Sequence, residues 1–231
     1  MTSKTLILLT AILLLLGCDN QLTFEELMKQ GEQYSATGKT EKAIEAYKKA
    51  VAQKPDEASV HVALGDAYYK RMEAISRQTA TNAKEWEQIK NESASLQNLA
   101  IAEYRKELQK NKDNWRVRYR VAVELFNQKK YSEAIPEFQL TIKSNPQYAV
   151  AYSVLASSYL AVGQYELALK NIKLAHNLDH DDEHYYFHLG KAYYYMNEPK
   201  KGFAMESKLK AINSNYYQLL LDYRFSRKTE P

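Results

Sequence analysis

The sequence is poor in cysteine, proline and glycine. Its 231 residues include one cysteine, five prolines and seven glycines. A single cysteine has no partner within the chain, so a disulfide framework is excluded. Helix breakers are few, and the 19 tyrosines supply many large amphipathic side chains. These features predict an all-helical protein.

The charge is nearly balanced. Charged residues make up 26% of the chain and hydrophobic residues 45%, which indicates a folded rather than a disordered protein. A formal charge of +4 is too small to suggest a nucleic-acid partner. There is no Gly-x-Ser-x-Gly motif and no phosphate-binding loop, and the carboxylates are expected to be helix-surface charges. The sequence therefore predicts neither an enzyme nor a bound cofactor.

One apolar run, residues 5–16, stands near the N-terminus. It is too short to span a bilayer, which takes about 20 residues, and it resembles the core of a secretory signal peptide. The segment LLGC at residues 15–18 resembles the lipobox of bacterial lipoproteins. That resemblance implies a signal peptide at 1–17, lipid on Cys18 and a tether at 18–23. The alternatives are a buried cysteine in an ordinary leader and a short uncleaved anchor.

The same resemblance predicts where the protein resides. A lipoprotein of this kind is anchored to a bacterial membrane and faces the periplasm or the exterior. Asp19, directly after the cysteine, resembles a signal for retention at the inner membrane. Residues 19–23 reach at most about 17 to 18 Å, so the first helix is expected close to the lipid headgroups.

A 34-residue repeat runs through the rest of the chain. Each copy is defined by four positions. A small residue is followed after four residues by a large one, after three more by a third position, and after five more by a residue near the end of the helix. Three copies of this pattern are Ala43/Tyr47/Ala50/Pro55, Ala134/Phe138/Thr141/Pro146 and Ala168/Ile172/Ala175/His180. A looser copy begins at Ala100. The pattern resembles the tetratricopeptide repeat (TPR), a helix–turn–helix unit.

The TPR resemblance implies an all-α, right-handed superhelical solenoid of five helix pairs. Its array covers 24–216, followed by a capping helix and tail at 217–231. The five pairs are expected at 24–57, 58–114, 115–148, 149–182 and 183–216. In the last pair, Gly202 and Glu206 stand where a small residue and an aromatic are expected. This weakens the expectation of a second helix there.

Two segments depart from the simple repeat. WRVRYRV at 115–121 alternates like a strand, but the repeat places it at the start of a helix, where Arg116 and Arg120 lie on one side. These arginines are either solvated or a docking point for an acidic group. The pair 58–114 is 23 residues longer than its neighbours, with the extra length near 71–92. This predicts two lengthened helices projecting by about 15 Å, as a stabilising flap or a partner-binding arm.

Four histidines recur every four residues, at positions 176, 180, 184 and 188. On one continuous helix they would form a metal-binding stripe. The repeat places them on two helices and the turn between, so only His184 and His188 share a face. Packed or solvated histidines are expected, and no metal.

The TPR resemblance also implies a concave groove lined by the first helix of each pair. Its predicted partner-binding residues are Met28, Val62, Tyr69, Arg116, Tyr119, Val123, Phe126, Val150, Leu160, Phe187, Lys191 and Tyr194. An apolar, aromatic groove suits an extended or helical protein segment.

The sequence therefore predicts a membrane-anchored adaptor that organises an envelope complex, for pilus or secretin assembly, outer-membrane assembly or hydrolase recruitment. The alternatives are a module that binds envelope polysaccharide or peptidoglycan and a structural homo-oligomer.

Overall fold

The computed structural model describes residues 22–227, and every regular element in that range is a helix. The predictions for the signal peptide, Cys18 and Asp19 lie outside the described residues. The eleven helices are α2 (Phe24–Ala36), α3 (Thr40–Gln53), α4 (Ala58–Ser76), α5 (Ala83–Lys110), α6 (Trp115–Asn127), α7 (Tyr131–Ser144), α8 (Ala149–Ala161), α9 (Tyr165–Leu178), α10 (Asp182–Tyr195), α11 (Pro199–Ala211) and α12 (Tyr216–Arg227). No helix in this range combines the length and apolarity needed to cross a bilayer.

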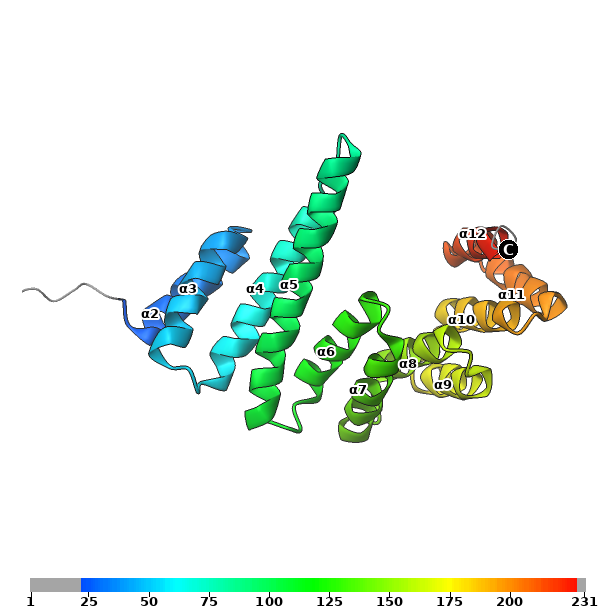
Figure 1. Cartoon of the computed structure of the whole chain (residues 1–231). Coiled ribbons are helices and arrows are strands. Elements are labelled where there is room, and N and C mark those ends of the chain that lie inside the picture. The colour runs from blue at the N-terminus through cyan, green and yellow to red at the C-terminus, as the bar shows by residue number, and fades with distance from the viewer. Residues whose placement is uncertain (1–21, 228–231) are drawn as a thin grey trace, which may run out of the picture.

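The helices form an elongated row in which each one packs mainly on its neighbours in sequence. The most extensive contacts lie within the pairs α2–α3, α4–α5, α6–α7, α8–α9 and α10–α11, and each pair then packs on the next. Figure 1 shows the row running from α2 at one end to α12 at the other. The prediction of an all-helical solenoid is confirmed.

Small residues bring the two helices of a pair together. The alanines at positions 43, 100, 134 and 168 are fully buried where the second helix of a pair crosses the first. Tyr47 and Phe138 fill the space beside them and are also buried. This alternation of small and large side chains packs the core at every repeat, since close packing needs complementary volumes.

Four of the five turns within pairs share one left-handed residue, and the longer turn between α4 and α5 has none. Gly38 and Gly163 have φ values of 72° and 77°, and Lys129 and Asn197 adopt 59° and 57° at the equivalent place. Positions 129, 163 and 197 are spaced 34 residues apart in the sequence. Glycine adopts this conformation at no steric cost, whereas lysine is strained there, so the repeated packing imposes the turn even where the residue does not favour it.

The segment 115–121 is helical, as the repeat predicts, and begins α6. The Asn114 side chain accepts a hydrogen bond from the Val117 amide at 3.3 Å and caps the helix. The two arginines differ. Arg116 is exposed and lies over the Trp115 ring, 4.5 Å from its centroid, while Arg120 forms an ion pair with Asp66 on α4. Arg120 is therefore part of the structure rather than a solvated charge.

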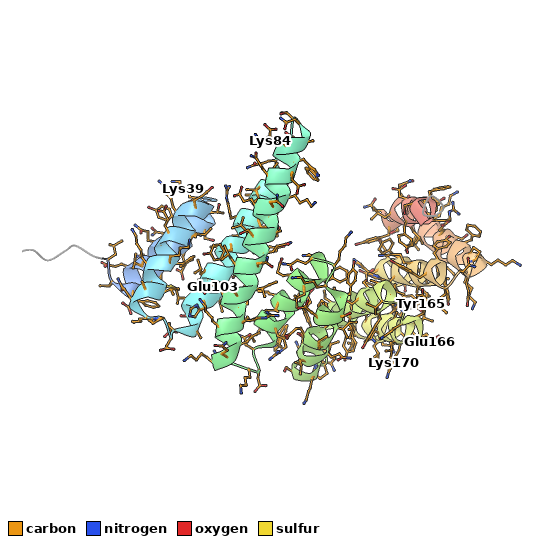
Figure 2. All side chains as sticks on the ribbon, in the orientation of Figure 1. Lys39, Lys84, Glu103, Tyr165, Glu166 and Lys170 are labelled. Carbon is orange, nitrogen blue, oxygen red and sulfur yellow. The ribbon has the colours of Figure 1, made fainter. Side chains whose placement is uncertain are left out.

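The lengthened pair is a helical hairpin that projects from the row (Figure 1). α4 has 19 residues and α5 has 28, and the turn between them lies within the predicted segment at 77–82. Met72, Ile75 and Leu96 are buried between the helices, and Arg71 joins the hairpin base to Glu41 on α3 at 2.9 Å. Lys84 stands at the free end (Figure 2).

The C-terminal end is helical where the repeat pattern is weakest. Gly202 on α11 lets the ring of Tyr194 pass close to the backbone. Glu206 then accepts hydrogen bonds from the Tyr194 hydroxyl at 2.5 Å and from Arg224 on α12 at 3.0 Å. The fully buried Leu220 of α12 packs against Tyr194 and closes the array. The substitution of a carboxylate for an aromatic residue is thus matched by partners on neighbouring helices.

Candidate functional site

A pocket of about 360 Å³ opens between α4, α5 and α6, near the middle of the row. It brings together three predicted groove residues from two helices: Tyr69 on α4 and Tyr119 and Val123 on α6. The complete lining is Asp66, Tyr69, Lys70, Glu73, Tyr104, Tyr119, Arg120, Val123 and Glu124. The volume falls within the range of about 300–1,000 Å³ that is typical of ligand sites.

Two of the predicted groove residues are buried rather than exposed on the groove. Leu160 is 2% exposed and belongs to the hydrophobic core. Tyr194 is 9% exposed, with its ring against Gly202 and its hydroxyl on Glu206. Both face a neighbouring helix and offer no surface to a partner.

The other predicted groove residues are distributed along the row. Phe126 packs on Tyr131 with ring centroids 5.4 Å apart, away from the pocket lining. Arg116 and Val150 are exposed. The remaining members are half-buried: Met28, Val62, Phe187 and Lys191. Val150 lines a second pocket, between α8, α9 and α10. The role of all these residues in partner binding stays a prediction.

An ion pair fixes one wall of the pocket. Arg120 on α6 pairs with Asp66 on α4, and Asp66 also accepts a hydrogen bond from the Tyr104 hydroxyl on α5 at 2.8 Å. Burial, followed by the charge of Asp66, raises the pKa of Tyr104 well above its usual range, so its hydroxyl stays protonated and donates. One carboxylate therefore ties together the three helices that enclose the pocket.

Tyr119 forms an aromatic wall. Its ring packs against Tyr148 in an edge-on arrangement with centroids 5.0 Å apart, and against Phe138 at 5.9 Å. These contacts hold the ring in one orientation. A fixed aromatic surface binds a partner side chain with little loss of conformational entropy.

Glu124 is the residue of this site that the sequence did not reveal. It is 2% exposed, and its Oε2 atom has no hydrogen-bond partner. Burial, and then the charge of Glu73 on α4, raises the pKa of Glu124 to about 7. From the sequence, the carboxylates in general were expected to be helix-surface charges, and Glu124 is an exception. Its burial follows from the way α4, α5 and α6 come together around the pocket, which the sequence does not show.

A second pocket, of about 300 Å³, lies between α8, α9 and α10 and contains three of the histidines. His176 stacks on Tyr185 with centroids 4.2 Å apart, and His184 hydrogen-bonds to Asp181 at 2.5 Å. Burial lowers the pKa of His188 to about 4, so this side chain is neutral at pH 7. Within residues 22–227 there is no group of three side chains that could hold a metal ion.

The hairpin combines a packed base with an exposed end. Arg71 bridges Glu41 on α3 and Glu92 on α5, at 2.9 and 3.3 Å. Trp86, near the turn, is 59% exposed. The structure therefore shows a stabilised base, and a role of the free end in partner binding stays a prediction.

Known proteins share this architecture. A sequence profile described as a TPR repeat matches residues 31–71. The solved structure of YrrB, described as a TPR protein with an unusual peptide-binding site, has a TM-score of 0.67 and 16% identity, over 86% of this chain and 90% of that one. A MamA protein from Desulfovibrio magneticus RS-1 has a TM-score of 0.67 and 18% identity, over 82% of this chain and 94% of that one.

A second MamA structure, from MSR-1, has 25% identity and a TM-score of 0.55, over 69% of this chain and 78% of that one. Among curated proteins, none matches the sequence significantly. At these identities the structural likeness establishes the fold. The chain thus has the fold of tetratricopeptide-repeat proteins, and residues 31–71 match the sequence profile of the repeat.

Proposed function

We propose that this protein is an adaptor that binds a segment of a partner protein in the central pocket between α4, α5 and α6. The observation that carries the proposal is the convergence of Tyr69, Tyr119 and Val123 on one cavity. Aromatic residues in a largely desolvated pocket are the usual energetic centre of a protein interface. The description of YrrB as a protein with a peptide-binding site supports the same use of this fold.

The proposal includes a membrane anchor. The lipobox-like segment at 15–18 supports lipid attachment at Cys18, which would fix α2 close to a bacterial membrane. The partner would then be a component of the cell envelope that is bound to the membrane or comes to it. Asp19 supports the inner membrane, and fractionation of membranes on a sucrose gradient tests that assignment.

Affinity capture from native membranes tests the adaptor function. The bait is the full chain, and the pocket variant is Tyr69→Ala with Tyr119→Ala. We expect this variant to lose about 2–4 kcal/mol of binding, a fall of roughly 30- to 900-fold in affinity, while its helical circular dichroism stays unchanged.

The matched control is Leu140→Ala with Leu167→Ala. These leucines are both 43% exposed and lie outside the pocket, on α7 and α9. Normal capture by the pocket variant, with loss of capture in Trp86→Ala, would move the site to the end of the hairpin. Capture of envelope polysaccharide, or of a second copy of the chain alone, would replace the adaptor function.

A further inference from the structure

We propose that the central pocket accepts an arginine side chain of the partner, with Glu124 as its counter-ion. This inference rests on the proposed function and specifies the chemistry of the segment that is bound. A buried carboxylate that faces a cavity without a partner is costly, because its desolvation is not compensated.

Of the other three buried glutamates in the described chain, two have cationic partners, and Glu107 accepts hydrogen bonds from the side-chain amides of Asn111 and Asn114. Glu103 pairs with His61 at 2.7 Å and with Lys106 at 2.9 Å. Glu206 pairs with Arg224 at 3.0 Å. Glu124 has no comparable ion pair, and its position on the cavity wall leaves room for a cation supplied from outside.

The positive charges around the pocket are already engaged. Arg120 pairs with Asp66, and the Lys70 ammonium donates to the Ser35 hydroxyl at 2.8 Å. Glu73 has an exposed partner, Arg77, at 3.9 Å. The lining holds three carboxylates, Asp66, Glu73 and Glu124, and two cations, Lys70 and Arg120. With Glu124 ionised it therefore carries one net negative charge, which favours a basic group over an acidic one.

The walls select arginine rather than lysine. Tyr69 and Tyr119 contribute aromatic rings to the lining, whereas the Tyr104 ring is 1% exposed and already lies under Arg120, 5.7 Å from its guanidinium carbon. A guanidinium stacks on such rings through its flat face and donates two parallel hydrogen bonds to a carboxylate through its edge. An ammonium group makes neither arrangement as well. An apolar side chain would fill the space but would leave Glu124 without a partner.

Binding of a cation would be linked to pH. Glu124 is largely protonated below about pH 7 and must ionise to form the pair, so affinity rises as the pH increases through 7. The other charged or titratable groups that face it are Asp66, Lys70, Glu73 and Tyr69 on α4, Tyr104 on α5, and Tyr119 and Arg120 on α6. The lining has no histidine that could impose the same dependence.

The test uses nuclear magnetic resonance of the full chain in detergent micelles. The probe is N-acetyl-L-arginine N-methylamide, compared with the leucine and glutamate analogues. We expect the arginine probe to shift the backbone amides around Tyr69 and Val123 and to bind at least fivefold more tightly than either analogue. Its affinity should rise at least threefold from pH 6 to pH 8.

Glu124→Gln should remove both the preference for arginine and the pH dependence. Glu107→Gln is the matched control, because Glu107 is also buried with a free Oε2 but lies outside the pocket. An equal affinity for the arginine and leucine probes, an unchanged preference in Glu124→Gln, or no shift with any probe would each overturn the inference. Tight binding of the leucine probe alone would leave the adaptor function intact, since that function is judged by capture of the partner.

Discussion

Gly65 on α4 lies directly against the ring of Tyr104 on α5: a β-carbon at position 65 would be 2.5 Å from the Tyr104 Cε1 atom. Tyr104 is 1% exposed, and its hydroxyl donates to Asp66 in the pocket wall. A β-carbon at position 65 would therefore have to displace the ring and disturb its hydrogen bond to Asp66. The absence of a side chain at position 65 sets both the spacing of the hairpin helices and the shape of the pocket.

Gly65→Ala should therefore lower the free energy of unfolding by about 1–3 kcal/mol, through steric overlap with Tyr104. The effect opposes helix propensity, which favours alanine over glycine by about 1 kcal/mol. Urea denaturation measures the difference. The reverse substitution Ala94→Gly, at an exposed position of α5, measures the effect of helix propensity without steric overlap. A Gly65→Ala variant as stable as the unmodified protein would show that the two helices can separate freely.

A second prediction concerns the buried pair of His61 and Glu103. The His61 ring lies 2.7 Å from the Glu103 carboxylate through Nδ1 and 2.8 Å from the Pro55 carbonyl through Nε2. His61→Leu should cost about 3 kcal/mol of stability, because it leaves a buried carboxylate with only Lys106 as a partner. In a double-mutant cycle, His61→Leu with Glu103→Leu should recover most of that loss. Additive losses in the cycle would mean that the two side chains do not interact.

Glu124 should destabilise the fold at alkaline pH. Its pKa is raised from an ordinary value of 4.5 to about 7, so the folded state binds the proton more tightly than the unfolded state. The contribution of Glu124 to the free energy of unfolding is fully present at low pH, where the carboxyl is protonated, and is lost as the pH rises from about 4.5 to 7. The full shift would correspond to about 3 kcal/mol, and water reaching the pocket reduces the expected effect to about 1–2 kcal/mol.

Glu124→Gln should accordingly be more stable than the unmodified protein at pH 8 and similar to it at pH 4.5. Chemical denaturation at the two pH values measures this. Equal stability changes at both pH values would show that folding does not raise the pKa of Glu124.

The lipid anchor makes a separate prediction. Cys18→Ser should abolish labelling with palmitate, or should leave a precursor about 17 residues longer than the mature protein. Metabolic labelling followed by gel electrophoresis measures both. Normal palmitate incorporation in the variant would show that the lipid is not attached at Cys18.

Much of the fold could be predicted from the sequence because its signals are local. α3 ends at Gln53 and α7 at Ser144, each shortly before a proline. The 34-residue spacing also identified α6 as a helix despite its strand-like alternation. Such features depend on residues within one helix pair.

The polar interior could not be predicted because its partners are distant in sequence. His61 lies 42 residues from Glu103, and Asp66 lies 54 residues from Arg120. Helical periodicity shows which residues share a face. Tyr119 and Val123, which the repeat resemblance placed on one stripe, both line the central pocket. Periodicity does not show which side chains of other helices bury a carboxylate or pair with it. Glu124 was therefore missed, and Leu160 and Tyr194 were assigned to the surface.

The central claim is that a partner protein binds at the pocket between α4, α5 and α6. Site-specific photocrosslinking in intact cells tests it most directly, with p-benzoylphenylalanine replacing in turn Tyr69 in the pocket, Trp86 near the hairpin end and Leu140 on α7. We expect a crosslink to one envelope protein from position 69, with little from 86 or 140. Crosslinks from 86 or 140 but not from 69, or from 69 only to a second copy of this chain, would contradict it.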